Sequence, residues 1–309
     1  MSLVTHHLSL PLVLDTRQLG RPGIVAATAL ETQDGIALFD TGAESTFDNV
    51  IAELRKAGFA PEDVRHVFLS HIHFDHAGAA WRFARTAMTY VHPRGAEHLI
   101  DPTKLIASAT RIFGGEMERL WGRIAPVPAE RVKVLEDNEV VRLPPFEIRA
   151  IATPGHANHH HVYHWDDNVF GGDIAGVRIG HGPPIPPFVP PDLHVESWLE
   201  SIRKIRALNP AHLYLPHFGK IDSIRDHLDA LEERVICWSK WLHDEIRAGL
   251  SEQQLVYGFA DYEHSELRAW GATDEDVQGY EAADPSYMAV GAAIRYWNKY
   301  HPEAMAGNK

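Results

Sequence analysis

His71-Ile72-His73-Phe74-Asp75-His76 is the most informative segment of the sequence, because three histidines and one carboxylate fall within six residues. It directly follows the apolar run 64–69, which predicts a buried strand. A neutral imidazole offers a lone pair to a divalent cation, and a carboxylate adds negative charge and a hard oxygen. A loop that leaves a strand can point all four side chains inward, whereas a helix or a strand at this spacing could not. The segment therefore predicts a metal-binding loop at the end of a strand.

Further candidate ligands occur at the ends of other predicted strands. In each case Gly or Pro makes the turn, and a His or Asp lies just past a short apolar run. Ligands in open α/β architectures gather at the ends of strands along one edge of the sheet, so we expect these residues to converge. The candidates are His156 after the strand 146–151, Asp173 after Val169-Phe170, and His217 after the strand 213–215.

The order of these motifs resembles the metallo-β-lactamase-fold hydrolase superfamily over roughly residues 20 to 220. That resemblance implies an α/β fold, an αββα sandwich of two mixed sheets with helices outside and the site at one edge. The motifs that carry the resemblance are Asp40-Thr41-Gly42, His71-x-His73-x-Asp75-His76, Thr153-Pro154-Gly155-His156, Asp173 and His217.

The resemblance also implies a site for two divalent metal ions. Five histidines and two carboxylates suit zinc, which we expect, and iron or manganese is compatible with the same set. The ligands implied are His71, His73 and His156 for one metal, Asp75, His76 and His217 for the second, and Asp173 as a bridge between both.

Two further roles follow from the resemblance. Asp40 is expected to orient a ligand by hydrogen bonding, and Asp75 could also take a proton during the reaction. Two ions that share a water lower the pKa of that water to around 7. The resemblance thus predicts a metal-dependent hydrolase acting on a small ester, lactone, thioester or related substrate.

Departures from known relatives narrow this prediction. Class B β-lactamases do not use a bridging aspartate at the position of Asp173, which argues against β-lactam hydrolysis as the main role. Flavin-linked diiron proteins carry glutamate where His73 stands. Two alternatives stay open: a mononuclear iron enzyme similar to persulfide dioxygenases, and a metabolite-binding protein with vestigial catalysis.

Composition limits the partners. The chain has 309 residues with 29 basic and 42 acidic side chains, a net charge of −13, and such a surface repels nucleic acid. A single cysteine, Cys237, excludes an internal disulfide and a multi-cysteine metal site. No apolar run approaches the roughly 18–20 residues of a membrane span, and the start of the chain lacks the pattern of a signal peptide. We expect a cytoplasmic protein that binds a small-molecule substrate and neither nucleic acid nor membrane.

The chain is expected to form a catalytic domain over residues 1–220 and a helical C-terminal extension over residues 221–309 packed on it. Asp34-Gly35 between two apolar runs predicts a β-hairpin. Beyond Gly219, apolar residues from Ile224 to Ile246 recur every three or four positions, which predicts a helix. Core packing is the simplest role for this extension; a lid or a homodimer contact is the alternative.

Six prolines between Pro183 and Pro191 predict a stiff extended loop. Because this loop follows Asp173 closely, we expect it to border the pocket with Phe188 pointing inward. His160 is read either as a neighbour of the ligands or as an ordinary histidine at the start of a strand. Trp121 is read as helix core, with a place at the mouth of the pocket as the alternative.

Overall fold

The Asp34-Gly35 turn joins two strands of the first sheet, as predicted. In the computed structural model, which describes residues 10–305, β2 and β3 pair antiparallel with Thr32 opposite Gly35. The sheet has the strand order β1-β2-β3-β4-β5-β6 and is antiparallel from β1 to β3 and parallel from β3 to β6. Its strands are β1 (Leu12–Asp15), β2 (Ala26–Thr32), β3 (Gly35–Phe39), β4 (Val64–Phe68), β5 (Met88–Val91) and β6 (Val132–Val134).

The second sheet has the order β12-β11-β10-β9-β8-β7. The pairs β7–β8 and β11–β12 are antiparallel, whereas β10 and β11 are parallel, so this sheet is mixed like the first. Its strands are β7 (Val140–Leu143), β8 (Phe146–Ala152), β9 (His161–Trp165), β10 (Asn168–Phe170), β11 (His212–Leu215) and β12 (Gly219–Ile221).

The described residues divide into two compact units. Unit 1 comprises residues 10–151 and 163–166, and unit 2 comprises residues 152–162 and 167–305. The helices after residue 224 belong to the same unit as β10, β11 and β12. The predicted boundary at residue 220 stays a prediction. No helix within residues 10–305 is long and apolar enough to cross a membrane.

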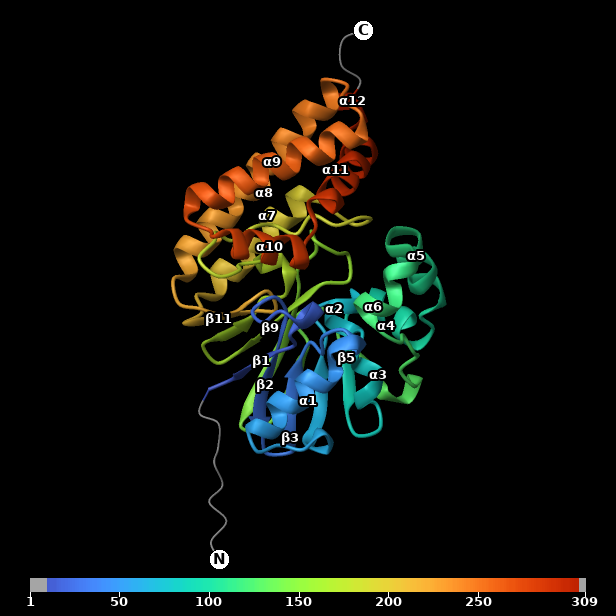
Figure 1. Ribbon diagram of the computed structural model, residues 1–309. Helices are drawn as coiled ribbons and strands as arrows, with labels where there is room; N and C mark the ends of the chain where they lie inside the picture. Colours follow the sequence, from blue (N-terminus) through green and yellow to red (C-terminus); the bar gives the residue numbers. More distant parts are fainter. Residues whose placement is uncertain (1–9, 306–309) are drawn as a thin grey trace, which may run out of the picture. The chain divides into compact units, whose positions relative to one another are not determined.

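Helices cover the first sheet in unit 1. The apolar residues of α1 recur at helical spacing, so Val50, Ile51 and Leu54 are buried on one face and join Leu38 and Val67 of the sheet in one core (Figure 1). The helices of this unit are α1 (Phe47–Lys56), α2 (Phe74–Ala77), α3 (Ala80–Phe83), α4 (Pro93–Ile100), α5 (Thr103–Phe113) and α6 (Met117–Trp121), with 3-10 turns η1 (Gln18–Gly20), η2 (Glu44–Thr46), η3 (Pro61–Asp63), η4 (Gly114–Glu116) and η5 (Ala129–Arg131).

Aromatic rings pack strands of the two sheets together within unit 1. The ring of Phe39 on β3 stacks on Trp165 of β9 with centroids 4.7 Å apart. Phe68 on β4 meets Tyr163 of β9 edge-on at 5.2 Å. All four side chains are fully buried, and rings in these geometries attract beyond the area that they bury. These contacts hold residues 163–165 of β9 against the first sheet.

The predicted C-terminal helices are present in unit 2. The apolar face of α8 is buried as its spacing predicts, and Trp238 on this face meets Phe259 of α9 edge-on at 5.2 Å. Figure 1 shows α8, α9 and α11 running alongside one another. The helical elements of this unit are η6 (Asp173–Ala175), α7 (Val195–Leu208), α8 (Ile224–Arg247), α9 (Glu252–Trp270), α10 (Asp274–Ala283), α11 (Ser286–Tyr300) and α12 (Pro302–Met305). The predicted α/β fold of two mixed sheets with a C-terminal helical region is therefore confirmed.

A carboxyl group is buried among these helices. Glu263 on α9 is 2% exposed, and its Oε2 lies 3.0 Å from Ser286 Oγ at the start of α11. The same hydroxyl contacts Glu281, whose carboxylate also accepts from His264 Nε2 at 2.8 Å. Ser286 has one proton for two carboxylates, so the network is satisfied when Glu263 is protonated and donates to Ser286. Burial, followed by the nearby Glu281 charge, raises the pKa of Glu263 to about 8.

We predict that Glu263→Gln alters the pH dependence of stability. In the wild type, the folded state holds a proton on Glu263 that the unfolded state has released, so the free energy of unfolding falls as pH rises from about 4.5 towards 8. The amide cannot ionise. The wild type should therefore lose about 4 kcal/mol of unfolding free energy between pH 5 and pH 9 that the variant does not lose.

Urea unfolding at each pH measures this difference. The matched control is Glu275→Gln, at an exposed position on α10. Parallel wild-type and Glu263→Gln stability curves from pH 5 to 9 would contradict the assignment.

Candidate functional site

Asp40 is the centre of the hydrogen-bond network in unit 1. It directly follows β3, is 1% exposed and has a positive φ of 55°, which Asp tolerates better than most residues. Its Oδ1 accepts from the amide of Ser70 at 2.7 Å, and its Oδ2 accepts from the Ser70 hydroxyl at 2.8 Å. Oδ2 also contacts Nδ1 of His76 at 2.8 Å. Since β3 and β4 are parallel neighbours, the residues that follow them meet at the same edge.

This network assigns the tautomers of two histidines. A carboxylate only accepts, so Ser70 must donate its hydroxyl proton to Asp40 and can then accept from Nδ1 of His71, 2.9 Å away. For the same reason Nδ1 of His76 carries its proton towards Asp40. With Nδ1 protonated, the neutral form of each ring presents its lone pair on Nε2, as metal ligands do.

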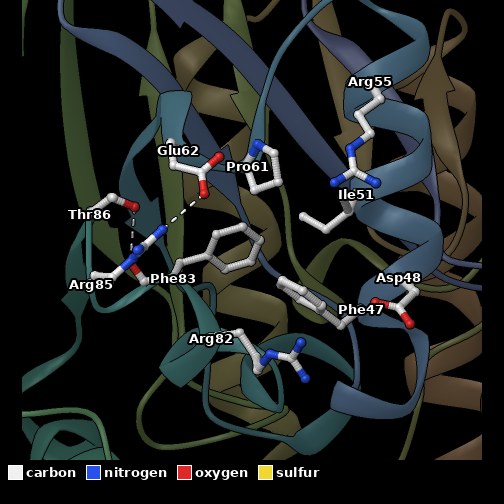
Figure 2. Close-up of a pocket in the computed structure, with 10 residues that line it drawn as sticks. All are labelled: Phe47, Asp48, Ile51, Arg55, Pro61, Glu62, Arg82, Phe83, Arg85 and Thr86. Atoms are coloured by element: carbon white, nitrogen blue, oxygen red, sulfur yellow. Dashed lines mark hydrogen bonds and ion pairs between the residues drawn. The ribbon is translucent and has the colours of Figure 1, made fainter.

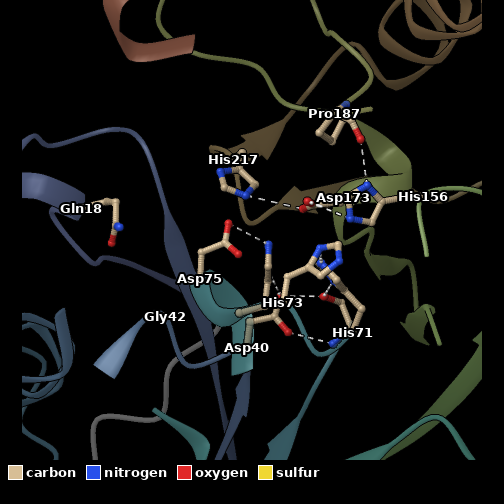
Figure 3. Close-up of polar contacts among 12 residues, drawn as sticks. Gln18, Asp40, Gly42, His71, His73, Asp75, His156, Asp173, Pro187 and His217 are labelled. Atoms are coloured by element: carbon tan, nitrogen blue, oxygen red, sulfur yellow. Dashed lines mark hydrogen bonds and ion pairs between the residues drawn. The ribbon is translucent and has the colours of Figure 1, made fainter. Parts of the chain in front are cut away.

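Ligand atoms of the histidine-rich segment converge within unit 1 (Figure 3). Nε2 of His71 lies 2.9 Å from Nδ1 of His73. Nε2 of His76 lies 3.3 Å from Oδ2 of Asp75. The sequence predicted a loop over this whole segment, and that prediction is wrong for its second half. The carbonyl of His73 accepts from the amides of His76 and Ala77, and α2 begins at Phe74. The helical turn α2 thus positions Asp75 and His76, whereas the loop before it positions His71 and His73.

The three remaining candidates come together in unit 2. His156 follows β8, Asp173 begins η6 after β10, and His217 follows β11. Oδ2 of Asp173 lies 3.5 Å from Nε2 of His156, and Oδ1 lies 3.5 Å from Nε2 of His217. All three side chains are buried. Each short strand end contributes one residue, as the sequence pattern predicts.

The donor chemistry of both sets fits a divalent cation. Nδ1 of His156 contacts the carbonyl of Pro187 at 2.9 Å, and a carbonyl only accepts, so Nδ1 carries the proton. A neutral His156 then turns the lone pair of Nε2 towards the Asp173 carboxylate. His76 faces Asp75 in the same way. Two acceptors facing each other repel unless a proton or a metal cation lies between them, and these His and Asp groups could hold metal. The predicted pair of ions shared by all seven residues stays a prediction.

The turn η6 that carries Asp173 is held by neighbouring elements of unit 2. The carbonyl of Ile174 accepts from the indole of Trp198 on α7 at 2.9 Å. The carbonyl of Ala175 accepts from Nε2 of His227 on α8 at 2.8 Å. Complete burial lowers the pKa of His227 to about 4, so its ring is neutral at pH 7. The C-terminal helices therefore help to position a candidate ligand.

His160 contacts the same turn from the other side. Its ring is fully buried, its Nδ1 lies 2.9 Å from the hydroxyl of Thr153, and its Nε2 accepts from the amide of Ile174 at 3.4 Å. Of the two sequence interpretations, the structure therefore supports a neighbour of the ligands. Ser70, in contrast, was missed by sequence reasoning, although its place directly before His71 was a usable signal.

The proline-rich loop differs in one respect from the sequence prediction. It is extended, and the carbonyl of Pro187 contacts His156, so the loop borders a candidate ligand as expected. Phe188, however, is fully buried between Trp198 and Trp238, with ring centroids at 5.6 and 6.4 Å. The prediction that this ring faces the pocket is therefore wrong. Its large apolar surface is buried more favourably in the helical core.

A hollow of about 480 Å³ on unit 1 contains none of the candidate ligands (Figure 2). Phe47 and Phe83 line it together with arginines. Arg82 lies 4.1 Å above the ring of Phe47 and pairs with Glu44 at 2.6 Å. Arg85 likewise pairs with Glu62 at 2.9 Å, and no candidate metal-ligand group among the described residues lies in this hollow.

Relatives with known names share parts of this sequence. The chain is 29% identical over 170 residues to a metallo-beta-lactamase fold-containing protein, ST1585, of Sulfurisphaera tokodaii; the match covers 53% of this chain and 64% of that protein. It is 34% identical over 80 residues to an N-acyl homoserine lactonase of Bacillus cereus, over 18% of this chain and 32% of the lactonase. The chain thus spans less than two thirds of the length of these relatives.

Solved structures have the same fold. The metallo-beta-lactamase family protein TTHA1429 of Thermus thermophilus superposes with a TM-score of 0.66 at 19% identity, over 94% of each chain. At this identity the likeness shows the fold alone. The model of the metallo-beta-lactamase superfamily matches residues 20–217, which contain every candidate ligand. This chain therefore belongs to the metallo-beta-lactamase superfamily.

Proposed function

We propose that the protein is a metal-dependent hydrolase that cleaves a small ester, lactone, thioester or related bond with water. The ions would be two divalent cations, for which zinc is our first choice. The proposed ligands are His71, His73 and His156 for one ion, Asp75, His76 and His217 for the other, and Asp173 for both.

One observation carries this proposal. In each unit a histidine whose Nδ1 is committed to a hydrogen bond turns Nε2 towards a carboxylate, as His76 does to Asp75 and His156 to Asp173. Buried hydrogen bonds hold lone pairs and negative charge in place, and a bound cation would make this arrangement favourable. A protein that kept the fold for packing alone would gain nothing from it.

The chain's own residues prepare the chemistry. Bound divalent cations would supply a Lewis acid and lower the pKa of water towards neutrality. Asp40 keeps His71 and His76 in the ligand tautomer through Ser70 and by direct contact. Asp75 is the most exposed carboxylate of the set, at 16% of its side chain, and we propose that it receives a proton during turnover.

The substrate class follows from charge and from relatives. A net charge of −13 disfavours polyanionic substrates and favours small neutral ones. The lactonase similarity, though it covers only 18% of this chain, supports placing N-acyl lactones in the substrate panel.

The direct test is metal analysis together with hydrolysis assays. Elemental analysis of purified protein should find two transition-metal ions per chain, and the loaded protein should hydrolyse at least one of an ester, a lactone and a thioester. Removal of metal with a chelator should abolish this activity, and added zinc should restore it. One oxygen-sensitive iron per chain, or metal-loaded protein inert on all three bonds, would contradict the proposal.

Asp173→Ala should lose at least one metal ion and nearly all turnover. The substitution removes both oxygens that face His156 and His217, so two histidines lose the negative charge between them. The primary readout is the number of metal ions per chain, measured by inductively coupled plasma mass spectrometry. Asp167→Ala, at an exposed residue near β10, is the matched control. An Asp173→Ala protein with full metal content would refute the bridging role.

Asp40→Asn should weaken metal binding about 10- to 100-fold without unfolding the protein. The amide nitrogen of Asn cannot accept from Ser70 and His76, so the tautomers of His71 and His76 are no longer fixed. Competition with a chelating dye gives the dissociation constant, and circular dichroism checks the fold. The control is Asp48→Asn, at an exposed residue of α1. An unchanged constant for Asp40→Asn would show that Asp40 does not position these ligands.

A further inference from the structure

Residues 177–187 of unit 2 form a strap that connects two of the candidate ligands. Near its start, the amide of Arg178 donates to the backbone carbonyl of His217. At its end, the carbonyl of Pro187 accepts from Nδ1 of His156 at 2.9 Å, a contact drawn in Figure 3. The strap therefore contacts one residue from each of the two proposed sets of three ligands.

The second half of the strap is poor in hydrogen-bond donors of its own. Val177 and Ile185 exchange two backbone hydrogen bonds, at 2.9 Å from the amide of Val177 and at 2.8 Å from the amide of Ile185. The other positions from 183 to 187 are prolines, which have no N–H, so Ile185 supplies the single backbone donor of this stretch. Any further anchoring has to come from donors elsewhere that reach the carbonyls of the strap.

Tyr280 of α10 supplies such a donor. Its hydroxyl donates to the carbonyl of Pro183 at 2.6 Å and accepts from the amide of Ile179 at 3.0 Å. The side chain is fully buried, and burial raises the pKa of its phenol above the ordinary value, so the hydroxyl keeps the proton that it donates. One buried group thus holds the strap at two points.

The backbone of the strap lies directly against α10. A Cβ atom at Gly182 would overlap the ring of Tyr280, and one at Gly180 would overlap the carboxylate of Asp276. The amide of His181, which lies between these glycines, also donates to Asp276. Glycine at both positions therefore permits a close approach that a larger residue would prevent.

The chain between Pro183 and Pro187 is stiff. Proline fixes φ near −65°, and extended proline-rich segments keep their shape over several residues. Phe188 anchors the far end of the strap in the helical core, so the Pro187 carbonyl has little freedom as long as Tyr280 holds the near end. This carbonyl decides which nitrogen of His156 carries the proton, because a carbonyl only accepts.

We propose that Tyr280 is a positioning residue of the candidate metal site, which holds the strap so that Pro187 keeps the proton of His156 on Nδ1. The lone pair of Nε2 is then directed to the ion. Tyr280 acts through the strap and is not itself a ligand. The inference gives α10, which carries no candidate ligand, a role in the site. It deepens the proposed hydrolase function and rests on it for the identity of the ligands.

The decisive variant is Tyr280→Phe, which removes the hydroxyl and keeps the ring. Competition between the full-length protein and a chelating dye for zinc should give a dissociation constant about tenfold higher than that of the wild type. Nitrogen NMR of isotope-labelled histidines in the metal-free, full-length protein reports the tautomers. His156 should carry its proton on Nδ1 in the wild type and populate both tautomers in the variant. His71 and His76 should keep theirs, because Asp40 fixes them independently of the strap.

Three further variants separate positioning from general stability. Gly182→Ala should act in the same direction as Tyr280→Phe, since its methyl group pushes the strap away from the phenol. Tyr257→Phe, at an exposed position of α9, is the matched control for loss of a hydroxyl. Leu255→Ala opens a cavity near the start of α9 and removes none of the polar contacts of the strap. It should leave the zinc dissociation constant within about twofold and the His156 tautomer unchanged.

Several results would overturn the role of Tyr280. An unchanged zinc dissociation constant in Tyr280→Phe would do so, and so would an unchanged His156 tautomer. An equal effect of Leu255→Ala would mean that metal binding follows the stability of the helices alone. Neither readout involves hydrolysis. Zinc-loaded protein that is inert on the ester, the lactone and the thioester would therefore overturn the proposed function and leave the positioning role standing.

Discussion

The carboxylate of Asp40 is the constraint on which the histidine-rich segment depends. It is enclosed at the end of β3, and it accepts three hydrogen bonds from Ser70 and His76. Without this acceptor, the protons of two imidazole rings could occupy either nitrogen. Because the Asp40 carboxylate is buried, its charge must be compensated by fixed hydrogen-bond donors in place of water. The αL backbone of Asp40 is part of this arrangement, since it turns the carboxylate towards the residues after β4.

Strand ends explain why so much of the site could be predicted from the sequence. Candidate ligands that follow short apolar strands can be recognised in the sequence, because the apolar run predicts the strand and Gly or Pro marks the turn after it. His156, Asp173 and His217 were found in this way, and the structure brings these three together in unit 2. Hydrophobic periodicity likewise predicted α8, because its apolar residues form one continuous face along the helix.

What the sequence could not provide depends on contacts between distant residues. The helical turn at Phe74 is too short for a periodic signal, and it forms because the carbonyl of His73 caps two amides. The burial of Phe188 depends on two tryptophans, 10 and 50 positions further along. The role of Pro187 is carried by a backbone carbonyl, which no residue pattern reveals. The two compact units alternate along the chain between residues 152 and 166, which depends on packing between distant residues.

The hydrogen bonds that hold η6 link the candidate metal site to the stability of the helical region. Trp198 and His227 hold the two carbonyls that follow Asp173, and they belong to helices α7 and α8. Anything that binds the folded Asp173 and not the unfolded chain stabilises the elements that hold it, by mass action. Occupancy of a site at one strand end is thereby coupled to the melting of helices that carry no ligand. In this protein the C-terminal helices are part of the scaffold of the candidate metal site, so any metal that Asp173 holds would depend on them.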